Sequence, residues 1–236
     1  MGRAFEIRRG SKEKRWDKMS KLFPKLAKSI TIAAKEGGDD PDSNSKLRLA
    51  IAAAKSENMP KDNIKKAIDR ATGKDAANYT EVTYEAKGPH GVLLYIECAT
   101  DNTNRSITNV KTIINKSDGQ MMNSGAFDFM FSRKAVVEFT LTDGVDLEEV
   151  ELSLIDGGLE ELNEEDGIVY CYGEYSSFSN LTKACEELGL EITKASLQRI
   201  PSNPTEFSEE QLTEIEEVID KLEDDEDVQA VFANIG

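Results

Sequence analysis

The amino-acid sequence predicts a multidomain α+β protein. We expect an N-terminal three-helix bundle followed by two α/β sandwich-like domains, the second of which is ferredoxin-like and inserted in the first. Three observations lead to this expectation. Apolar residues recur at helical spacing in residues 24–71, strand-like runs begin at residue 81, and the elements of residues 135–197 follow the order β-α-β-β-α-β. That order is typical of the ferredoxin-like arrangement.

Three amphipathic helices with short polar connections account for residues 24–71. Proline at the first turn, serine or asparagine at the N-cap and glycine after the last turn set their expected boundaries. The helices are expected to run from Pro24 to Gly37-Gly38, from Ser43 or Asn44 to Glu57, and from Pro60 to Gly73. Residues 1–22 show no clean period, so we expect either an extended arm or a helix that orders on a partner.

A first sheet begins at residue 81 and is left incomplete. Its strand-like runs are Val92–Cys98 and the alternating Phe127, Phe129 and Phe131, with a helix that ends near Gly119 between them. Near the C-terminus, a predicted helix over residues 212–222 and a strand, Val228–Phe232, have no neighbours of their own. We therefore expect this helix and strand to complete the first sheet.

The elements between these two parts form a unit of their own. In chain order they are the strand Ala135–Leu141, the helix Leu147–Ile155, the strands Leu159–Leu162 and Ile168–Tyr172, the helix Phe178–Leu188 and the strand Leu190–Leu197. Because the segments before and after this unit are expected to form one sheet together, the unit is interpreted as an insertion between them. The predicted domains are residues 1–77, residues 78–133 together with 201–236, and the inserted residues 134–200.

Positive charge is concentrated in the first third of an acidic chain. The formal net charge is −16, yet residues 1–75 hold 19 of the 29 Lys and Arg and 11 of the 45 Asp and Glu. This part therefore has a net charge of +8, and the remaining 161 residues have −24. Such asymmetry indicates a module that binds a polyanion, attached to a body that does something else. A solvated basic face is the alternative interpretation.

The candidate nucleic-acid contacts are the cations of the first 28 residues and the polar face of the third helix. They are Arg3, Arg8, Arg9, Lys12, Lys14, Arg15, Lys18, Lys21, Lys25, Lys28, Lys61, Asn63, Lys65, Lys66 and Arg70. Lys25 and Lys28 fall on the face of the first helix opposite its apolar stripe. On the third helix, Asn63 and Arg70 are the side chains suited to reading base edges, although no turn shows clear helix-turn-helix spacing.

Three classes of function remain open at this point. The first is a DNA-binding regulator, which would place a helix of the bundle in the major groove. The second is an RNA- or ribosome-associated factor, in which the acidic body limits nonspecific adhesion. The third is an enzyme or small-molecule sensor built on the ferredoxin-like unit, but no constellation of residues favours an enzyme. The oligomeric state is not predicted.

Metal, cofactor and membrane chemistry are not expected. His90 is the single histidine and lies in a Gly-Pro-His-Gly turn signature, and no P-loop or dinucleotide fingerprint is present. A calcium-loop match fails at Ser45 and Ile51. The three cysteines lack CxxC spacing, so we expect buried free thiols in a reducing cytoplasm. Residues 1–28 are charged without an apolar core, which is not typical of a secretory signal.

The polar loop Asp101–Arg105 has two interpretations. It caps a helix that starts near Ser106, with Asn104 or Thr103 as the N-cap. Alternatively, Asn102, Asn104 and Arg105 face a ligand from the end of the preceding strand. Both interpretations use the same residue types, so both are kept as expectations.

Two stretches carry a resemblance to a known family. GGDDPDSNSKLRLAIAAAKSENMPKDNIKKAI (Gly37–Ile68) closely resembles the hallmark segment of the YebC/PmpR family, and ATDNTNRS (Ala99–Ser106) resembles its second signature. DGQMMNSGAF (Asp118–Phe127) is a looser match to the glycine-rich stretch of the family. The opening MGRAFEIRRGSKEKRWDKMSK differs from the common AGHSKW-type start and resembles the subgroup that begins MGRAFE.

The resemblance implies a three-domain cytoplasmic bacterial protein with a helical N-terminal domain and two α/β domains, one interrupting the other. It also implies a transcriptional regulator that binds DNA. Related proteins are described instead as translation factors that act on ribosomes, including at proline-rich stretches. The resemblance implies neither catalysis nor a cofactor.

Overall fold

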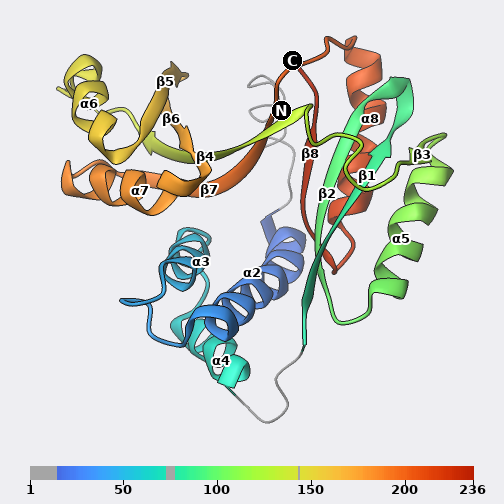
Figure 1. The fold of residues 1–236 in the computed structure, drawn as a ribbon, viewed down its shortest axis with the longest axis horizontal. Coiled ribbons are helices and arrows are strands. Elements are labelled where there is room, and N and C mark those ends of the chain that lie inside the picture. The colour runs from blue at the N-terminus through green and yellow to red at the C-terminus, as the bar shows by residue number, and fades with distance from the viewer. Residues whose placement is uncertain (1–14, 73–77, 143) are drawn as a thin grey trace.

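The computed structural model describes residues 15–72, 78–142 and 144–236. Three bodies are visible in Figure 1: a helical module and two four-stranded antiparallel sheets, each with helices on one face. We call them the helical module (residues 15–72), the first unit (the sheet with α5 and α8) and the inserted unit (the sheet with α6 and α7). The predicted α+β fold class is therefore confirmed.

The helical module consists of α2 (Arg15–Gly37), α3 (Ser45–Ser56) and α4 (Lys61–Thr72). Its core contains Ile30, Leu47 and Ile64, each at most 6 % exposed. Asn44, one of the two expected N-caps, caps α3: its side chain accepts a hydrogen bond from the Leu47 amide at 3.0 Å and donates to the Ala33 carbonyl at 2.7 Å. This side chain therefore ties the start of α3 to the end of α2.

The expected start of the first helix at Pro24 is wrong. Pro24 lies inside α2, which begins nine residues earlier at Arg15. An internal proline removes a single backbone hydrogen bond, so it does not have to end a helix that is held elsewhere. Here Lys21, upstream of the proline, forms an exposed ion pair with Asp224 at 2.7 Å, and Lys25 and Lys28, just after the proline, donate hydrogen bonds to carbonyls of the C-terminal region.

The first unit is assembled from two distant parts of the chain. Its sheet has the order β3-β1-β2-β8, with β1 (Thr80–Lys87), β2 (Leu93–Thr100), β3 (Gln120–Met121) and β8 (Val228–Ala233). The helices α5 (Thr103–Lys116) and α8 (Glu209–Glu223) cover one face through a shared apolar core. Because β8 pairs with β2, the C-terminal segment completes the sheet as the sequence predicts.

The inserted unit contains β4 (Phe131–Thr140), α6 (Leu147–Leu154), β5 (Leu159–Glu165), β6 (Ile168–Glu174), α7 (Phe178–Glu187) and β7 (Ile192–Pro201). Its strand order is β5-β6-β4-β7, and every pairing is antiparallel. This is the ferredoxin-like topology. Phe139, Leu154 and Leu181 fill the core between the sheet and its helices. The exact domain limits near residues 77, 133 and 200 stay a prediction.

The strand predicted around Phe127, Phe129 and Phe131 is wrong in its first half. Phe127 and Phe129 belong to turns, and β4 begins at Phe131. The reason is the buried carboxylate of Glu85, which accepts hydrogen bonds from the amides of Gly125 and Phe127 at 2.7 and 2.6 Å. These bonds fold the segment into a loop that buries Phe127 and leaves Phe129 96 % exposed.

Candidate nucleic-acid interface

Helix α4 presents a basic face to solvent. Its opposite face, which includes Ile64 and Ala67, is buried in the bundle core. Asn63 is half-buried, and the four cations of α4 are exposed: Lys61, Lys65, Lys66 and Arg70. None of these four cations forms an ion pair with a residue that the structure describes. The same helix carries the exposed Asp62 and Asp69, so four cations against two carboxylates leave it a net charge of about +2.

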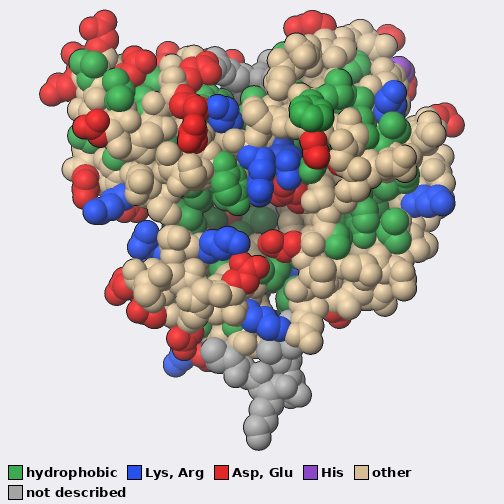
Figure 2. Space-filling view, in the orientation of Figure 1, with side chains coloured by type: hydrophobic (Ala, Val, Ile, Leu, Met, Phe, Trp, Pro, Cys, Tyr) green, Lys and Arg blue, Asp and Glu red, His purple; other side chains and the backbone are tan. Residues whose placement is uncertain are grey.

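Helix α3 adds two cations that the sequence interpretation missed. Arg48 and Lys55 are exposed and line a cavity of about 700 Å³ between α3 and the inserted unit. Lys194 of β7 lines the cavity from the other side. Arg48 and Lys55 are seven residues apart and hence share one helical stripe, which is the signal in the sequence that would have found them. Figure 2 shows a hollow where the three bodies meet, with Lys and Arg side chains on its rim.

The connection between α3 and α4 has the length of a helix-turn-helix turn. Four residues, Glu57–Pro60, separate the two helices. Asn58 has a φ of 59°, a left-handed conformation that asparagine tolerates better than most residues. The sequence showed no clear helix-turn-helix spacing, whereas a connection of three to four residues is the usual length in that motif. Both helices pack mainly on α2 and hardly on each other, so the match to that motif is in the length of the connection only.

The lysines of α2 have a different environment. Lys21, Lys25 and Lys28 face the loop between α8 and β8, where Lys21 pairs with Asp224 and Lys25 donates a hydrogen bond to the Glu223 carbonyl. Lys28 is only 9 % exposed. Burial lowers the pKa of Lys25 to about 8 against the partly compensating charges of the nearby carboxylates. In this structure these three lysines therefore engage the first unit, which only the tertiary contacts reveal, and their contact with nucleic acid stays a prediction.

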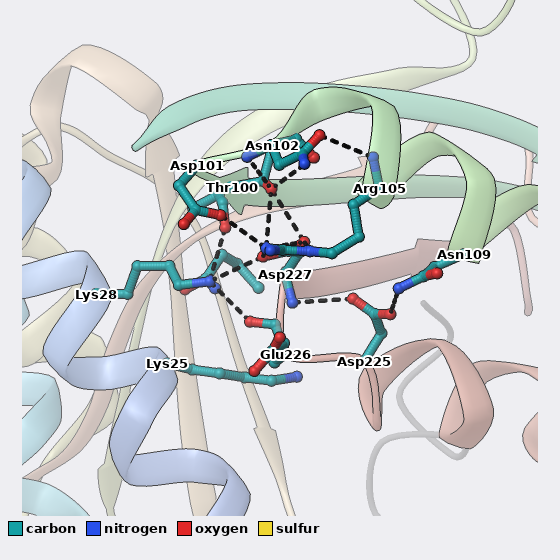
Figure 3. A network of polar contacts seen from close by, with 12 residues as sticks. Lys25, Lys28, Thr100, Asp101, Asn102, Arg105, Asn109, Asp225, Glu226 and Asp227 are labelled. Atoms are coloured by element: carbon teal, nitrogen blue, oxygen red, sulfur yellow. Dashed lines mark hydrogen bonds and ion pairs between the residues drawn. The ribbon is translucent and has the colours of Figure 1, made fainter. Parts of the chain in front are cut away.

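Asp227 is the centre of this contact (Figure 3). Its carboxylate is 1 % exposed and accepts hydrogen bonds from Lys28 Nζ at 3.3 Å, Thr100 Oγ1 at 3.0 Å and Arg105 Nη2 at 2.9 Å. Burial alone would raise the pKa of Asp227, but hydrogen bonds from Arg105, Thr100 and Lys28 lower it below its usual value. A negative charge is therefore held between two cations at neutral pH.

The signature loop supplies one of those cations. Asn102 caps α5 by accepting a hydrogen bond from the Arg105 amide at 3.1 Å, so the expected N-cap at Asn104 or Thr103 is wrong by one to two residues. The helix begins earlier because Thr100 Oγ1 and the Asn102 amide form a tight turn at 3.0 Å. Arg105 points to Asp227 and Asp101, whereas Asn104 is exposed. The ligand-facing interpretation therefore has no support from Arg105.

The remaining predicted contacts cannot be placed. Five of them lie outside the described residues: Arg3, Arg8, Arg9, Lys12 and Lys14. Arg15 and Lys18 belong to α2, but the described side chains begin after them. The arm therefore stays a prediction from its charge.

The groups relevant to metal, membrane, histidine and thiol chemistry can be located in the described part of the chain. Within it, no group of three or more His, Cys, Asp or Glu side chains is arranged to hold a metal ion. No helix among residues 15–72, 78–142 and 144–236 is long and apolar enough to cross a membrane. His90 lies in a turn, where its ring nitrogen is 2.8 Å from a carboxylate oxygen of Glu214. Cys98, Cys171 and Cys185 are free and buried.

Comparisons with known proteins cover the whole chain. Residues 3–74 match the TACO1/YebC protein N-terminal domain, and residues 79–235 match the TACO1/YebC second and third domain. A protein of Wolinella succinogenes named "Probable transcriptional regulatory protein" is 64% identical over 236 residues, which cover 100% of both chains. Proteins of the same name from Sulfurimonas denitrificans and Campylobacter jejuni are 58% and 57% identical, again over the full length of both chains.

A solved structure agrees with this result. The crystal structure of a conserved hypothetical protein from Aquifex aeolicus is similar, with a TM-score of 0.84 and 32% sequence identity. The match covers 94% of this chain and 92% of that protein. The predicted family resemblance is thereby confirmed in sequence and in fold. This chain belongs to the TACO1/YebC family.

Proposed function

We propose that this protein is a nucleic-acid-binding regulator of gene expression that binds DNA through the helical module. The observation that carries the proposal is the set of exposed cations that lie on two consecutive helices and form no ion pair with a residue in the described part of the chain. They are Arg48 and Lys55 of α3 and Lys61, Lys65, Lys66 and Arg70 of α4. Cations of this kind neutralise phosphates and release counterions, which supplies most nonspecific affinity for nucleic acid. The names of the relatives support a regulatory role.

The placement of α4 favours DNA as the partner. Helix α4 follows a turn of four residues, and it carries the half-buried Asn63 and the exposed Arg70. Asparagine pairs with adenine and arginine with guanine in the major groove, so these two side chains are the proposed base-reading residues. Lys61, Lys65 and Lys66 would contact phosphates and set the orientation of the helix.

A matched pair of variants tests the proposal. Lys65→Ala/Lys66→Ala removes two exposed lysines from α4, whereas Lys111→Ala/Lys116→Ala removes two exposed lysines from α5 of the acidic first unit. The α4 variant should bind a labelled DNA duplex more weakly and reduce the slope of log affinity against log salt by about 2. The α5 variant should bind like the unmodified protein. Equal affinity and slope in both variants would exclude α4 as the interface.

RNA is the alternative partner, as expected for a ribosome-associated translation factor. The observation that favours it is the acidic body beside the basic module, because its negative charge limits nonspecific adhesion inside a cleft lined by RNA. Ultraviolet crosslinking in cells followed by nuclease treatment separates the two. DNase-sensitive adducts support the regulator of transcription, and RNase-sensitive adducts that map to ribosomal RNA support the translation factor.

A further inference from the structure

We propose that Asp227 is a positioning residue that fixes the helical module on the first unit through Lys28 and Arg105. This inference rests on the proposed function, since the module is the part that meets nucleic acid. In this arrangement the cations of α3 and α4 and the body behind them form one rigid surface. We call the contact of Lys28, Asp227 and Arg105 the clamp, because it joins the helical module to the first unit. The second signature of the family supplies Arg105 to this clamp.

The clamp joins three segments that are far apart in the sequence. Lys28 comes from α2, Arg105 from α5 and Asp227 from the turn just before β8, and Asp227 lies 199 residues after Lys28. Arg105 reaches the carboxylate with two nitrogens, Nε at 3.1 Å and Nη2 at 2.9 Å. Figure 3 shows Lys28 and Arg105 approaching Asp227 from opposite sides. Removal of the carboxylate would leave the buried Lys28 without an anionic partner and Arg105 with only the exposed Asp101.

Lys28 has no hydrogen-bonding capacity left for another partner. Its ammonium group has three protons, and it lies near three acceptors: the carbonyl of Ala99 at 2.8 Å, the carbonyl of Glu226 at 2.9 Å and the carboxylate of Asp227 at 3.3 Å. Such a group is costly to shift because every displaced bond would leave a buried polar atom unsatisfied. The position of α2 relative to β2 and β8 is therefore closely defined.

Apolar contacts between the helical module and the first unit do not fix the orientation of α2 in the same way. Among the described residues, the core of the helical module and the core of the first unit are separate clusters without a shared member. The contact between α2 and the first unit is instead polar, and it includes Ser29 Oγ at 3.3 Å from Gln229 Oε1. Apolar burial is non-directional, whereas hydrogen bonds to charged groups require a defined geometry. We therefore assign the orientation of α2 on the first unit to the Asp227 network, whereas α3 packs separately on the inserted unit through Leu49.

Asp227→Asn tests the proposal because net charge and orientation predict opposite changes in the affinity for DNA. The variant keeps every cation and makes the protein less negative, so simple electrostatics predicts tighter binding of a polyanion. Loss of the fixed orientation predicts the reverse, a fall in affinity for a labelled DNA duplex of about tenfold, within the usual range of coupling between sites. Asp224→Asn is the matched control, because it removes the charge of a neighbouring carboxylate that is exposed and whose ion pair with Lys21 lies at the surface.

Orientation is measured separately by crosslinking. Cysteines at Ser29 and Gln229 would be joined by a short bismaleimide, since the native cysteines are buried. The yield should fall several-fold with Asp227→Asn and stay unchanged with Asp224→Asn. If Asp227→Asn does not fold, Lys28→Met replaces it, as it breaks the same clamp from the other side. Crosslinking the Asp227→Asn protein before the binding assay should restore its affinity, which a purely structural defect would not allow.

The outcomes separate the clamp from the proposed function. Unchanged crosslinking together with equal or tighter DNA binding by Asp227→Asn would overturn the clamp. Failure of the unmodified protein to bind DNA or RNA would overturn the proposed function, while the crosslinking yield would still decide whether Asp227 fixes the module. A lower crosslinking yield with unchanged affinity for DNA would show that Asp227 joins the two bodies, and it would reject the positioning role in DNA binding.

Discussion

The buried carboxylate of Glu85 offers the sharpest test of how this fold is held together. Glu85 is 2 % exposed, and its two oxygens accept hydrogen bonds from the amides of Gly125 and Phe127 at 2.7 and 2.6 Å. Glu85→Gln preserves the shape of the side chain but replaces one acceptor oxygen by an NH₂ group. One of the two amides must then lose its partner, and the other loses a charged acceptor.

The size of the effect follows from the burial of the two amides. Phe127 is 3 % exposed, whereas Gly125 is exposed. The glutamine oxygen should therefore face Phe127, and the Gly125 amide should turn toward water. Losing the charge on the first bond costs about 1 kcal/mol, and the partly solvated second amide costs about 1 kcal/mol more. We expect the free energy of unfolding to fall by about 2 kcal/mol, and by more for Glu85→Ala, which leaves both amides unpaired.

Urea unfolding followed by circular dichroism measures this change. Glu81→Gln is the control, because Glu81 is an exposed glutamate of the same strand and its change should stay within about 0.5 kcal/mol. Limited chymotrypsin digestion provides a second readout, since Phe129 is 96 % exposed and loosening of the loop should speed cleavage there. A Glu85→Gln protein as stable and as resistant as the control would refute the role assigned to this carboxylate.

Two further predictions concern the module and its clamp. Ile64→Ala should destabilise the helical module by about 2–5 kcal/mol because Ile64 is 6 % exposed in its core, and a normal melting curve would show that the helical register is wrong. The hydrogen bonds that lower the pKa of Asp227 stabilise the fold above the unfolded pKa of about 4, and this contribution is lost as the pH falls through the lower folded pKa. Asp227→Asn should therefore flatten the acid limb of the curve of stability against pH, and an unchanged acid limb would contradict the lowered pKa.

Local patterns in the sequence were sufficient for most elements of the fold. The β-α-β-β-α-β order of residues 135–197 predicted the ferredoxin-like topology because strand and helix periods differ and each element buries its own face. The C-terminal strand Val228–Phe232 had no local neighbour, and this was enough to predict its return to the first sheet. The basic face of α4 was also evident, since charged residues and apolar residues alternate at helical spacing.

Only the tertiary structure decided which charges face solvent. Lys28 and Lys65 both lie on the polar face of a predicted amphipathic helix. In the structure, however, Lys28 is buried against Asp227 and Lys65 is exposed. Phe127 left its predicted strand because Glu85, 42 residues away, takes its amide. Periodicity reports which face of an element is apolar, but a charged side chain is satisfied by a partner that distant chain segments bring to it. Local sequence patterns therefore determined most of the elements and their apolar faces, and long-range folding determined the partners of the ionised groups.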